Sequence, residues 1–210
     1  RPSAYPAHYA AFLPRLKQAT GAVLNLTTGG SAVMTLDERL AAPMAAEPEM
    51  CSLNMGSMNF ALYPMAERIS EWKHDWEQPF LENSDDLIFK NTPRDIAYVL
   101  TELGVKRGAK FEFECYDVGH LYTLRHFFDR ALVKPPVFIQ FVMGILGGIG
   151  ADTENLVFMK KTADKLFGDQ YKWSILGAGR MQMPLAAVAA GMGGNVRVGL
   201  EDSLFISRGK

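Results

Sequence analysis

Short runs of β-branched and aromatic residues recur along the chain, separated by longer segments with helical signals. Six runs have the length and composition of strands. They are AVLNLTT (22–28), MCSLNMG (50–56), KFEFECYD (110–117), VFIQFVMG (137–144), KWSILGAG (172–179) and NVRVGLE (195–201). The pattern therefore predicts six strands.

Helix start and stop signals lie between these strands. Thr35 precedes LDERLAAPMA, and Thr92 with Pro93 opens a periodic apolar run that stops at Gly104. Three further segments have helical composition: GHLYTLRHFFDRAL (119–132), DTENLVFMKKTADKLFG (152–168) and MPLAAVAAGMGG (183–194). Strands that alternate with helices predict parallel βαβ units with right-handed crossovers, and hence the α/β class.

Polar and apolar residues alternate along four of the predicted strands, and successive strand residues point to opposite faces. The polar sets are Asn25 and Thr27, Ser52 and Asn54, Glu112 and Glu114, and Asn195, Arg197, Gly199 and Glu201. Both faces of a doubly wound sheet lie under helices, whereas a barrel encloses one face where polar side chains can converge. We therefore predict a (β/α)₈ TIM barrel with its active site at the carboxyl ends of the strands.

The predicted elements do not complete such a barrel. Six units are two short of eight, the chain opens on a helix and it ends soon after its last strand, whereas about 250 residues are typical. We expect one incomplete barrel domain over 1–210 that lacks the first two strands and the last helix. The segment 67–91 is too long for a standard connection and is predicted to be an insertion that covers the barrel mouth or forms oligomer contacts.

Composition narrows the classes of function. With 48% hydrophobic residues and a net charge of −1, the 210 residues can bury one core but offer no basic field for nucleic acid. The chain contains no run of 18 apolar residues, so no membrane-spanning helix is predicted. It also contains no polybasic segment that would indicate binding to a membrane surface. Cys51 and Cys115 each lie in an apolar strand segment, which predicts buried free thiols and a reducing, cytoplasmic location. A small-molecule partner is expected.

Three charged residues lie at the end of the last predicted strand. Arg197 and Glu201 are roughly 13 Å apart along an extended strand at about 3.3 Å per residue, so their spacing does not require an ion pair. Asp202 follows where the backbone can turn and return its carboxylate toward Arg197. A carboxylate at a barrel mouth serves as a metal ligand or an acid/base group, but charged strand ends are also often solvated or structurally paired. The spacing leaves these possibilities open.

Other candidate motifs are weaker. The four histidines show no HxH or HExxH spacing, so they do not predict a zinc site by themselves. Three glycine-rich turns could bind an anion through backbone N–H groups, but glycine also serves tight turns by allowing positive φ. They are TTGGS (27–31), GGIGAD (147–152) and GAGR (177–180), and none has the GxGxxG spacing of a nicotinamide site.

Four longer segments carry a resemblance to a known family. They are LNLTTGGS (24–31), EMCSLNMGSMNF (49–60), FIQFVMGILGGIGAD (138–152) and WSILGAGRMQMPLAAVAAGMGGNVRVGLEDSL (173–204). Together they resemble the β-keto acid cleavage enzymes, typified by 3-keto-5-aminohexanoate cleavage enzyme. The resemblance implies a zinc-dependent TIM-barrel acyltransferase that forms a homotetramer. Such an enzyme condenses a β-keto acid with the co-substrate acetyl-CoA and cleaves the product to acetoacetate and a new acyl-CoA.

The resemblance also assigns roles to residues. In that family an HxH pair and the Glu of the GLED motif hold zinc, which makes Glu201 a metal ligand and places the two histidine ligands outside this chain. Arg197 and Asp202 are the implied catalytic pair, in which Asp202 is the base and Arg197 keeps it oriented and ionised. The implied substrate-binding residues are Thr27, Gly30 and Ser52.

Two other interpretations stay open. The first is a different metal-assisted barrel aldolase or lyase that acts on a phosphorylated substrate held by the glycine-rich turns. The second is a non-catalytic barrel in which Arg197, Glu201 and Asp202 form a structural charge network. Turnover that requires acetyl-CoA would favour the acyl exchange over the aldolase or lyase. Zinc analysis of the full-length protein would distinguish the acyl exchange from the non-catalytic barrel.

Overall fold

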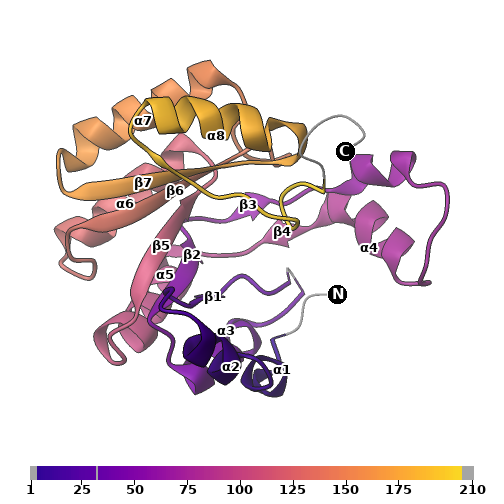
Figure 1. Ribbon diagram of the computed structural model, residues 1–210, viewed down its shortest axis with the longest axis horizontal. Coiled ribbons are helices and arrows are strands. Elements are labelled where there is room, and N and C mark those ends of the chain that lie inside the picture. Colours follow the sequence, from indigo (N-terminus) through magenta and orange to yellow (C-terminus); the bar gives the residue numbers. More distant parts are fainter. Residues whose placement is uncertain (1–3, 32, 205–210) are drawn as a thin grey trace.

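A computed structural model describes residues 4–31 and 33–204. Six parallel strands form one sheet in the order β1-β2-β5-β6-β7-β8, and the sheet is curved (Figure 1). The strands are β1 (Asn25–Thr27), β2 (Met50–Asn54), β5 (Lys110–Cys115), β6 (Val137–Met143), β7 (Tyr171–Gly177) and β8 (Asn195–Val196). All six predicted strands and the α/β class are confirmed. Among the described residues β1 and β8 are the two edges of an open sheet, consistent with part of a (β/α)₈ barrel.

Helices connect the strands, and Figure 1 shows α6, α7 and α8 along the outer side of the curved sheet. The connecting helices are α3 (Leu36–Ala46), α5 (Pro93–Val99), α6 (Val118–Asp129), α7 (Thr153–Phe167) and α8 (Gln182–Gly191), and α1 (Pro6–Ala10) and α2 (Leu13–Ala19) precede β1. Thr35 and Thr92 each form a capping box with the residue three positions later. These two caps are therefore confirmed. Among the described helices, none combines the length and apolar character that crossing a membrane requires.

The alternation along the strands separates a core face from an inner face. Leu53, Ile139 and Phe141 are fully buried in the main hydrophobic cluster, together with apolar residues of α5, α6 and α7. Burial of each such side chain contributes about 1.5–3 kcal/mol. Cys51 and Cys115 lie in the same cluster as free thiols, as predicted. Burial raises the pKa of Cys51 to about 12, so this thiol is uncharged near neutral pH.

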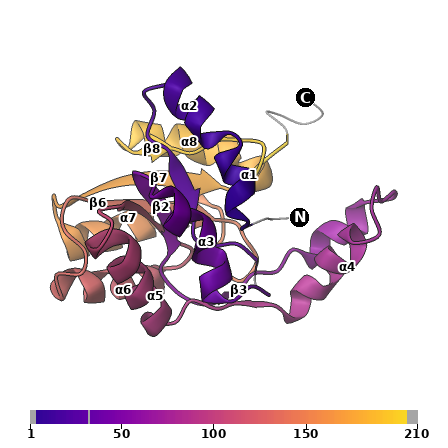
Figure 2. The same ribbon diagram turned by 90° about the horizontal axis from the view of Figure 1, so that it is seen from below.

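Residues 58–89 leave the sheet after β2 and return before α5; we call this segment the arm. Its two ends pair as the antiparallel strands β3 (Met58–Asn59) and β4 (Ile88–Phe89). Between them lie η1 (Tyr63–Arg68), α4 (Glu77–Glu82) and η2 (Asn83–Asp86). Figures 1 and 2 show α4 projecting well away from the sheet. The arm contains most of the predicted insertion, and its base packs at the carboxyl ends of β5, β6 and β7.

A buried arginine attaches the base of the arm to the rest of the chain. Arg39 of α3 donates hydrogen bonds to the carbonyl oxygens of Thr28 (Nε, 2.9 Å) and Lys90 (Nη1, 2.8 Å) and to Oδ1 of Asn91 (Nη2, 3.1 Å). Its guanidinium carbon also lies 4.6 Å from the ring centroid of Phe89. Burial lowers the pKa of Arg39. The turn after β1 and the end of the arm are therefore held by one side chain.

The last strand is shorter than the prediction of 195–201. The N–H of Arg197 still donates to the neighbouring strand, at 2.9 Å from the carbonyl oxygen of Ile175. The chain then turns, because the carbonyl oxygen of Gly199 accepts hydrogen bonds from the N–H groups of Asp202 and Ser203, both at 3.1 Å. This turn ends the strand and gives the charged residues after Val196 a new geometry.

Candidate active site

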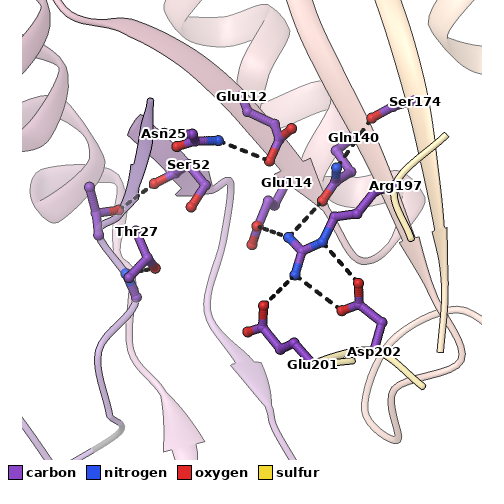
Figure 3. Close-up of polar contacts among 12 residues, drawn as sticks. Asn25, Thr27, Ser52, Glu112, Glu114, Gln140, Ser174, Arg197, Glu201 and Asp202 are labelled. Carbon is purple, nitrogen blue, oxygen red and sulfur yellow. Dashed lines mark hydrogen bonds and ion pairs between the residues drawn. The ribbon is translucent and has the colours of Figure 1, made fainter. Parts of the chain in front are cut away.

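A cavity of about 770 Å³ lies at the carboxyl ends of the strands. The inward positions of β1, β2 and β5 supply its polar residues, namely Asn25, Thr27, Ser52, Asn54, Glu112 and Glu114. Arg197, Glu201 and Asp202 enter it from the turn that follows β8. The convergence predicted from the alternation along separate strands is therefore present. Figure 3 shows Glu114, Glu201 and Asp202 pointing toward Arg197.

Arg197 is the centre of the polar network (Figure 3). Its Nε and Nη2 each lie 3.1 Å from one carboxylate oxygen of Asp202, which makes a bidentate pair. Nη2 also lies 2.9 Å from Oε2 of Glu201, and Nη1 lies 3.5 Å from Oε1 of Glu114 and 3.3 Å from Oε1 of Gln140. One guanidinium therefore contacts three carboxylates from two different regions of the chain.

The contact between Arg197 and Glu201 was left open by the sequence. Their spacing along an extended strand did not require an ion pair. The turn at Gly199 instead brings the Glu201 carboxylate back to within 2.9 Å of the guanidinium. The same turn returns Asp202 to Arg197, which confirms that part of the prediction.

The charge of Arg197 is stabilised by its surroundings. Burial on its own lowers the pKa of an arginine, but here hydrogen bonding and the charge of Asp202, followed by the charges of Glu114 and Glu201, outweigh burial and raise it. Arg197 is therefore a permanent cation in the cavity. Its partners differ in solvent contact, because the side chain of Asp202 is 7% exposed and that of Glu201 is 84% exposed.

Two buried carboxylates two positions apart complete the acidic side of the cavity. Burial raises the pKa of Glu114 to about 7, although the charge of Arg197 opposes this shift. The hydroxyl of Tyr116 donates a hydrogen bond to Oε2 of Glu114 at 3.0 Å. Burial also raises the pKa of Glu112, which accepts a hydrogen bond from Nδ2 of Asn25 at 3.4 Å. The alternation predicted Glu112 and Glu114 on the inward strand face but gave neither of them a chemical role.

Two polar residues of β6 and β7 extend the network and were missed. Gln140 accepts from Arg197 and donates through Nε2 to Oγ of Ser174 at 3.2 Å. Gln140 is the single polar residue of β6, and Ser174 lies within the apolar run Trp173–Leu176 of β7; both are buried. A polar residue in such a position needs a partner, which is the signal that could have found them.

Asn54 offers an unused hydrogen-bond acceptor to the cavity. Its residue is 6% exposed, and its Oδ1 has no hydrogen-bond partner among the described residues. The backbone of Asn54 is fixed, because its carbonyl oxygen accepts from Nδ2 of Asn91 at 2.6 Å. An unpaired buried acceptor costs about 1–3 kcal/mol, and a ligand that donates a hydrogen bond would recover this cost.

Of the residues implied to bind substrate, Thr27 and Ser52 line the cavity. Thr27 Oγ1 accepts the N–H of Gly29 at 2.9 Å, and Gly29 also lines the cavity. Gly30 does not; it adopts a φ of 62° and lies against the side chain of Arg39. Gly30 therefore shapes the turn beside the cavity, and its contact with substrate stays a prediction.

The sequence matches a protein family over its whole length. The model of the family described as beta-keto acid cleavage enzyme matches residues 1–210. The chain belongs to the β-keto acid cleavage enzyme family. This membership confirms the resemblance noted from the four sequence segments.

Individual relatives in this family act on different β-keto acids, according to their names. A 3,5-dioxohexanoate:acetyl-CoA acetone transferase of Paraburkholderia graminis is 60% identical over all of this chain and 67% of the relative. A 3-dehydrocarnitine:acetyl-CoA trimethylamine transferase of Rhizobium meliloti is 32% identical over 82% of this chain and 49% of the relative. A 3-keto-5-aminohexanoate cleavage enzyme of Acetoanaerobium sticklandii is 31% identical over 90% of this chain and 58% of the relative. The chain thus spans about half to two thirds of the length of these relatives.

The described residues of this β-keto acid cleavage family member supply little of a metal site. Within 4–31 and 33–204, no three His, Cys, Asp or Glu side chains are placed to hold a metal ion together. The carboxylate of Glu201 is exposed, lines the cavity and is a suitable oxygen ligand for zinc. Glu201 therefore fits the role of one ligand, and further ligands have to come from elsewhere.

Proposed function

We propose that the complete protein exchanges acyl groups between a β-keto acid and acetyl-CoA. A β-keto acid R–CO–CH₂–COO⁻ reacts with CH₃–CO–SCoA to give R–CO–SCoA and acetoacetate, CH₃–CO–CH₂–COO⁻. The observation that carries this proposal is the meeting of the Arg197–Asp202 pair with Thr27, Ser52 and Glu201 in one cavity of a family member. The bond between the acyl carbon and C2 is broken, and C2 forms a new bond to the acetyl group.

Asp202 is the proposed base for this reaction. It removes a proton from C2, between the keto group and the carboxylate, and thereby makes C2 a nucleophile. Its side chain is 7% exposed and its two oxygens are held by Arg197, so it is sheltered from water and fixed in orientation. Arg197 also places positive charge near the enolate, and the hydroxyls of Thr27 and Ser52 are suitable hydrogen-bond donors for its oxygen atoms.

Zinc is part of the proposal through Glu201. We propose that Glu201 is one ligand and that the HxH histidines implied by the family resemblance complete the site from outside this chain. When bound, Zn²⁺ acts as a Lewis acid that polarises a substrate carbonyl. The exposed carboxylate of Glu201 supports this role, because it already lies in the same cavity as the proposed base.

The first substrate to test is 3,5-dioxohexanoate, the one in the name of the 60% identical relative. The family resemblance further supports a homotetramer as a proposal, and the buried free thiols of Cys51 and Cys115 support a cytoplasmic location. The only partners we propose are small molecules, a β-keto acid and acetyl-CoA. No binding to nucleic acid or to a membrane is included.

A coupled assay tests the function directly. The complete protein is incubated with acetyl-CoA and a panel of β-keto acids, and acetoacetate and the new acyl-CoA are measured. We expect acetoacetate only when both substrates are present. Cleavage of a phosphorylated substrate without acetyl-CoA would instead favour an aldolase or lyase. A folded protein without zinc and without turnover, even after zinc is added, would favour a non-catalytic barrel.

A further inference from the structure

The cavity has two walls of opposite character. The polar wall comes from β1, β2, β5 and the turn after β8, and it carries every charged residue that lines the cavity. The apolar wall consists of residues of the arm and of the ends of β6 and β7. They are Phe60, Leu62, Phe80 and Phe89 from the arm, and Val142, Ile145, Leu176 and Ala178 from β6, β7 and the turns that follow them. The arm therefore contributes the aromatic residues of this wall.

The inner part of the apolar wall is a packed structure. Phe89, Val142 and Leu176 are buried and belong to a second hydrophobic cluster with Met58 and Tyr116. Val142 and Leu176 lie two residues beyond Gln140 and Ser174 on the same strand faces, so the inner face changes from polar to apolar toward the mouth. This cluster gives the wall a fixed shape.

The outer part of the wall is held by a buried serine of the arm. Ser84 is 4% exposed, and its Oγ accepts the N–H of Leu62 at 2.8 Å and donates to the carbonyl oxygen of Leu81 at 2.6 Å. Leu62 is thereby tied to the end of α4, whose Phe80 also lines the cavity. Although the arm is rich in acidic residues, none of them is among the residues that line the cavity.

We propose that this apolar wall holds the part of the β-keto acid beyond its keto group and selects substrates with an uncharged tail. A charged tail placed there would lose water without gaining a partner, which is strongly unfavourable. The buried inner members of the wall, Phe89, Val142 and Leu176, line the same cavity as Arg197 and Asp202, so a small substrate tail can reach them. This inference rests on the proposed acyl exchange and adds a substrate class to it.

Two six-carbon substrates test the inference because they differ only at the tail end. 3-Oxohexanoate ends in a methyl group, and 3-oxoadipate ends in a second carboxylate. With acetyl-CoA in the assay above, we expect the complete protein to use 3-oxohexanoate with a kcat/KM at least about 100-fold higher. Phe80→Arg should shift this ratio at least about 10-fold toward 3-oxoadipate, because it supplies a cation to the apolar wall.

Ile69→Arg is the matched control. Ile69 and Phe80 both belong to the arm and are each 37% exposed, but only Phe80 lines the cavity. Ile69→Arg should leave the substrate ratio within about twofold of the wild type, and both variants should keep their KM for acetyl-CoA. Thermal unfolding of both variants checks that they remain folded, and Phe80→Ala gives a second variant that should lower kcat/KM for 3-oxohexanoate alone by about 5–10-fold.

Three results would overturn the inference while leaving the acyl exchange intact. They are a wild type that prefers 3-oxoadipate, an equal shift of the ratio in both arginine variants, and a change confined to the KM for acetyl-CoA. A wild type that makes no acetoacetate from any β-keto acid would instead overturn the proposed function, and the inference with it.

Discussion

The two walls of the cavity are built in different ways. The polar wall consists of residues from regular strands and one tight turn, and it is held by hydrogen bonds that converge on Arg197. The apolar wall comes partly from the arm, a segment with little regular structure that is held by side-chain packing and by Arg39. Strands fix side chains more accurately than loops do, whereas loops tolerate change. The comparison suggests that the chemistry resides in one wall and substrate choice in the other.

The largest expected effect comes from breaking the polar wall at Asp202. Asp202→Asn keeps the size and one acceptor oxygen of the side chain but removes the base. Turnover should fall by about 10²–10⁴-fold, the usual contribution of general acid/base catalysis. The variant should keep its zinc and its thermal stability to within a few degrees. If it turns over β-keto acids at the wild-type rate, Asp202 is not the base.

Glu201→Gln tests whether Glu201, in the polar wall, is a zinc ligand. The amide is a poorer ligand than the carboxylate, so zinc content measured on the purified complete protein should fall sharply. Turnover should fall by at least about 10²-fold, because Lewis-acid stabilisation is worth several kcal/mol. Asp202→Asn is the matched comparison, since it alters the neighbouring carboxylate without removing a ligand. Full zinc occupancy in Glu201→Gln would show that Glu201 is not a ligand.

Arg39→Ala tests how the arm is attached. The change leaves the carbonyl oxygens of Thr28 and Lys90 and Oδ1 of Asn91 without this donor, so the free energy of unfolding should fall by about 2–4 kcal/mol in urea denaturation. Arg130→Ala is the control, because Arg130 is exposed and its Nη1 donates to the carbonyl oxygen of His126 at 3.1 Å, at the end of the same helix. Its loss should cost less than about 1 kcal/mol. Equal losses for the two variants would contradict the role given to Arg39.

Glu114→Gln has the smallest expected effect and depends on pH. Because burial raises the folded-state pKa of Glu114 from 4.5 to about 7, the unfolded chain releases this proton first as pH rises. Wild-type stability should therefore decline between about pH 4.5 and 7 through this group, by about 1–3 kcal/mol, and the decline should be absent in the variant. Urea denaturation at pH 5 and pH 8 measures the difference. If the free energy of unfolding changes with pH in the same way in both proteins, the pKa of Glu114 is not raised.

The sequence predicted those parts of the molecule that short-range rules determine. The six strands, the helix caps at Thr35 and Thr92 and the inward placement of Ser52 and Glu114 follow from composition and alternation, and the structure has them. The ion pair between Arg197 and Glu201 was left open because the last strand was predicted to extend to Glu201, whereas β8 ends at Val196. Hydrogen bonds to the carbonyl oxygen of Gly199 form a turn that brings Glu201 back to Arg197. The alternation of polar and apolar residues does not predict this turn.

The packing of the base of the arm could not be predicted from short-range rules, for a different reason. Its apolar residues, among them Phe60 and Phe89, acquire their role only by packing on the ends of strands that lie far away in sequence. The insertion predicted over 67–91 was recognised by its length and composition, which say nothing of where its ends dock. Gln140 was missed because its partner Arg197 is 57 positions away. Long-range contacts of this kind require the structure.

The central claim is that the polar wall exchanges the acyl group of a β-keto acid for the acetyl group of acetyl-CoA. The most direct test supplies the complete protein with 3,5-dioxohexanoate and acetyl-CoA that carries ¹³C in its acetyl group, and then locates the label by mass spectrometry. We predict label in acetoacetate and none in the new acyl-CoA, with both products lost in Asp202→Asn. Label in the new acyl-CoA, or acetoacetate formed without label, would contradict the account.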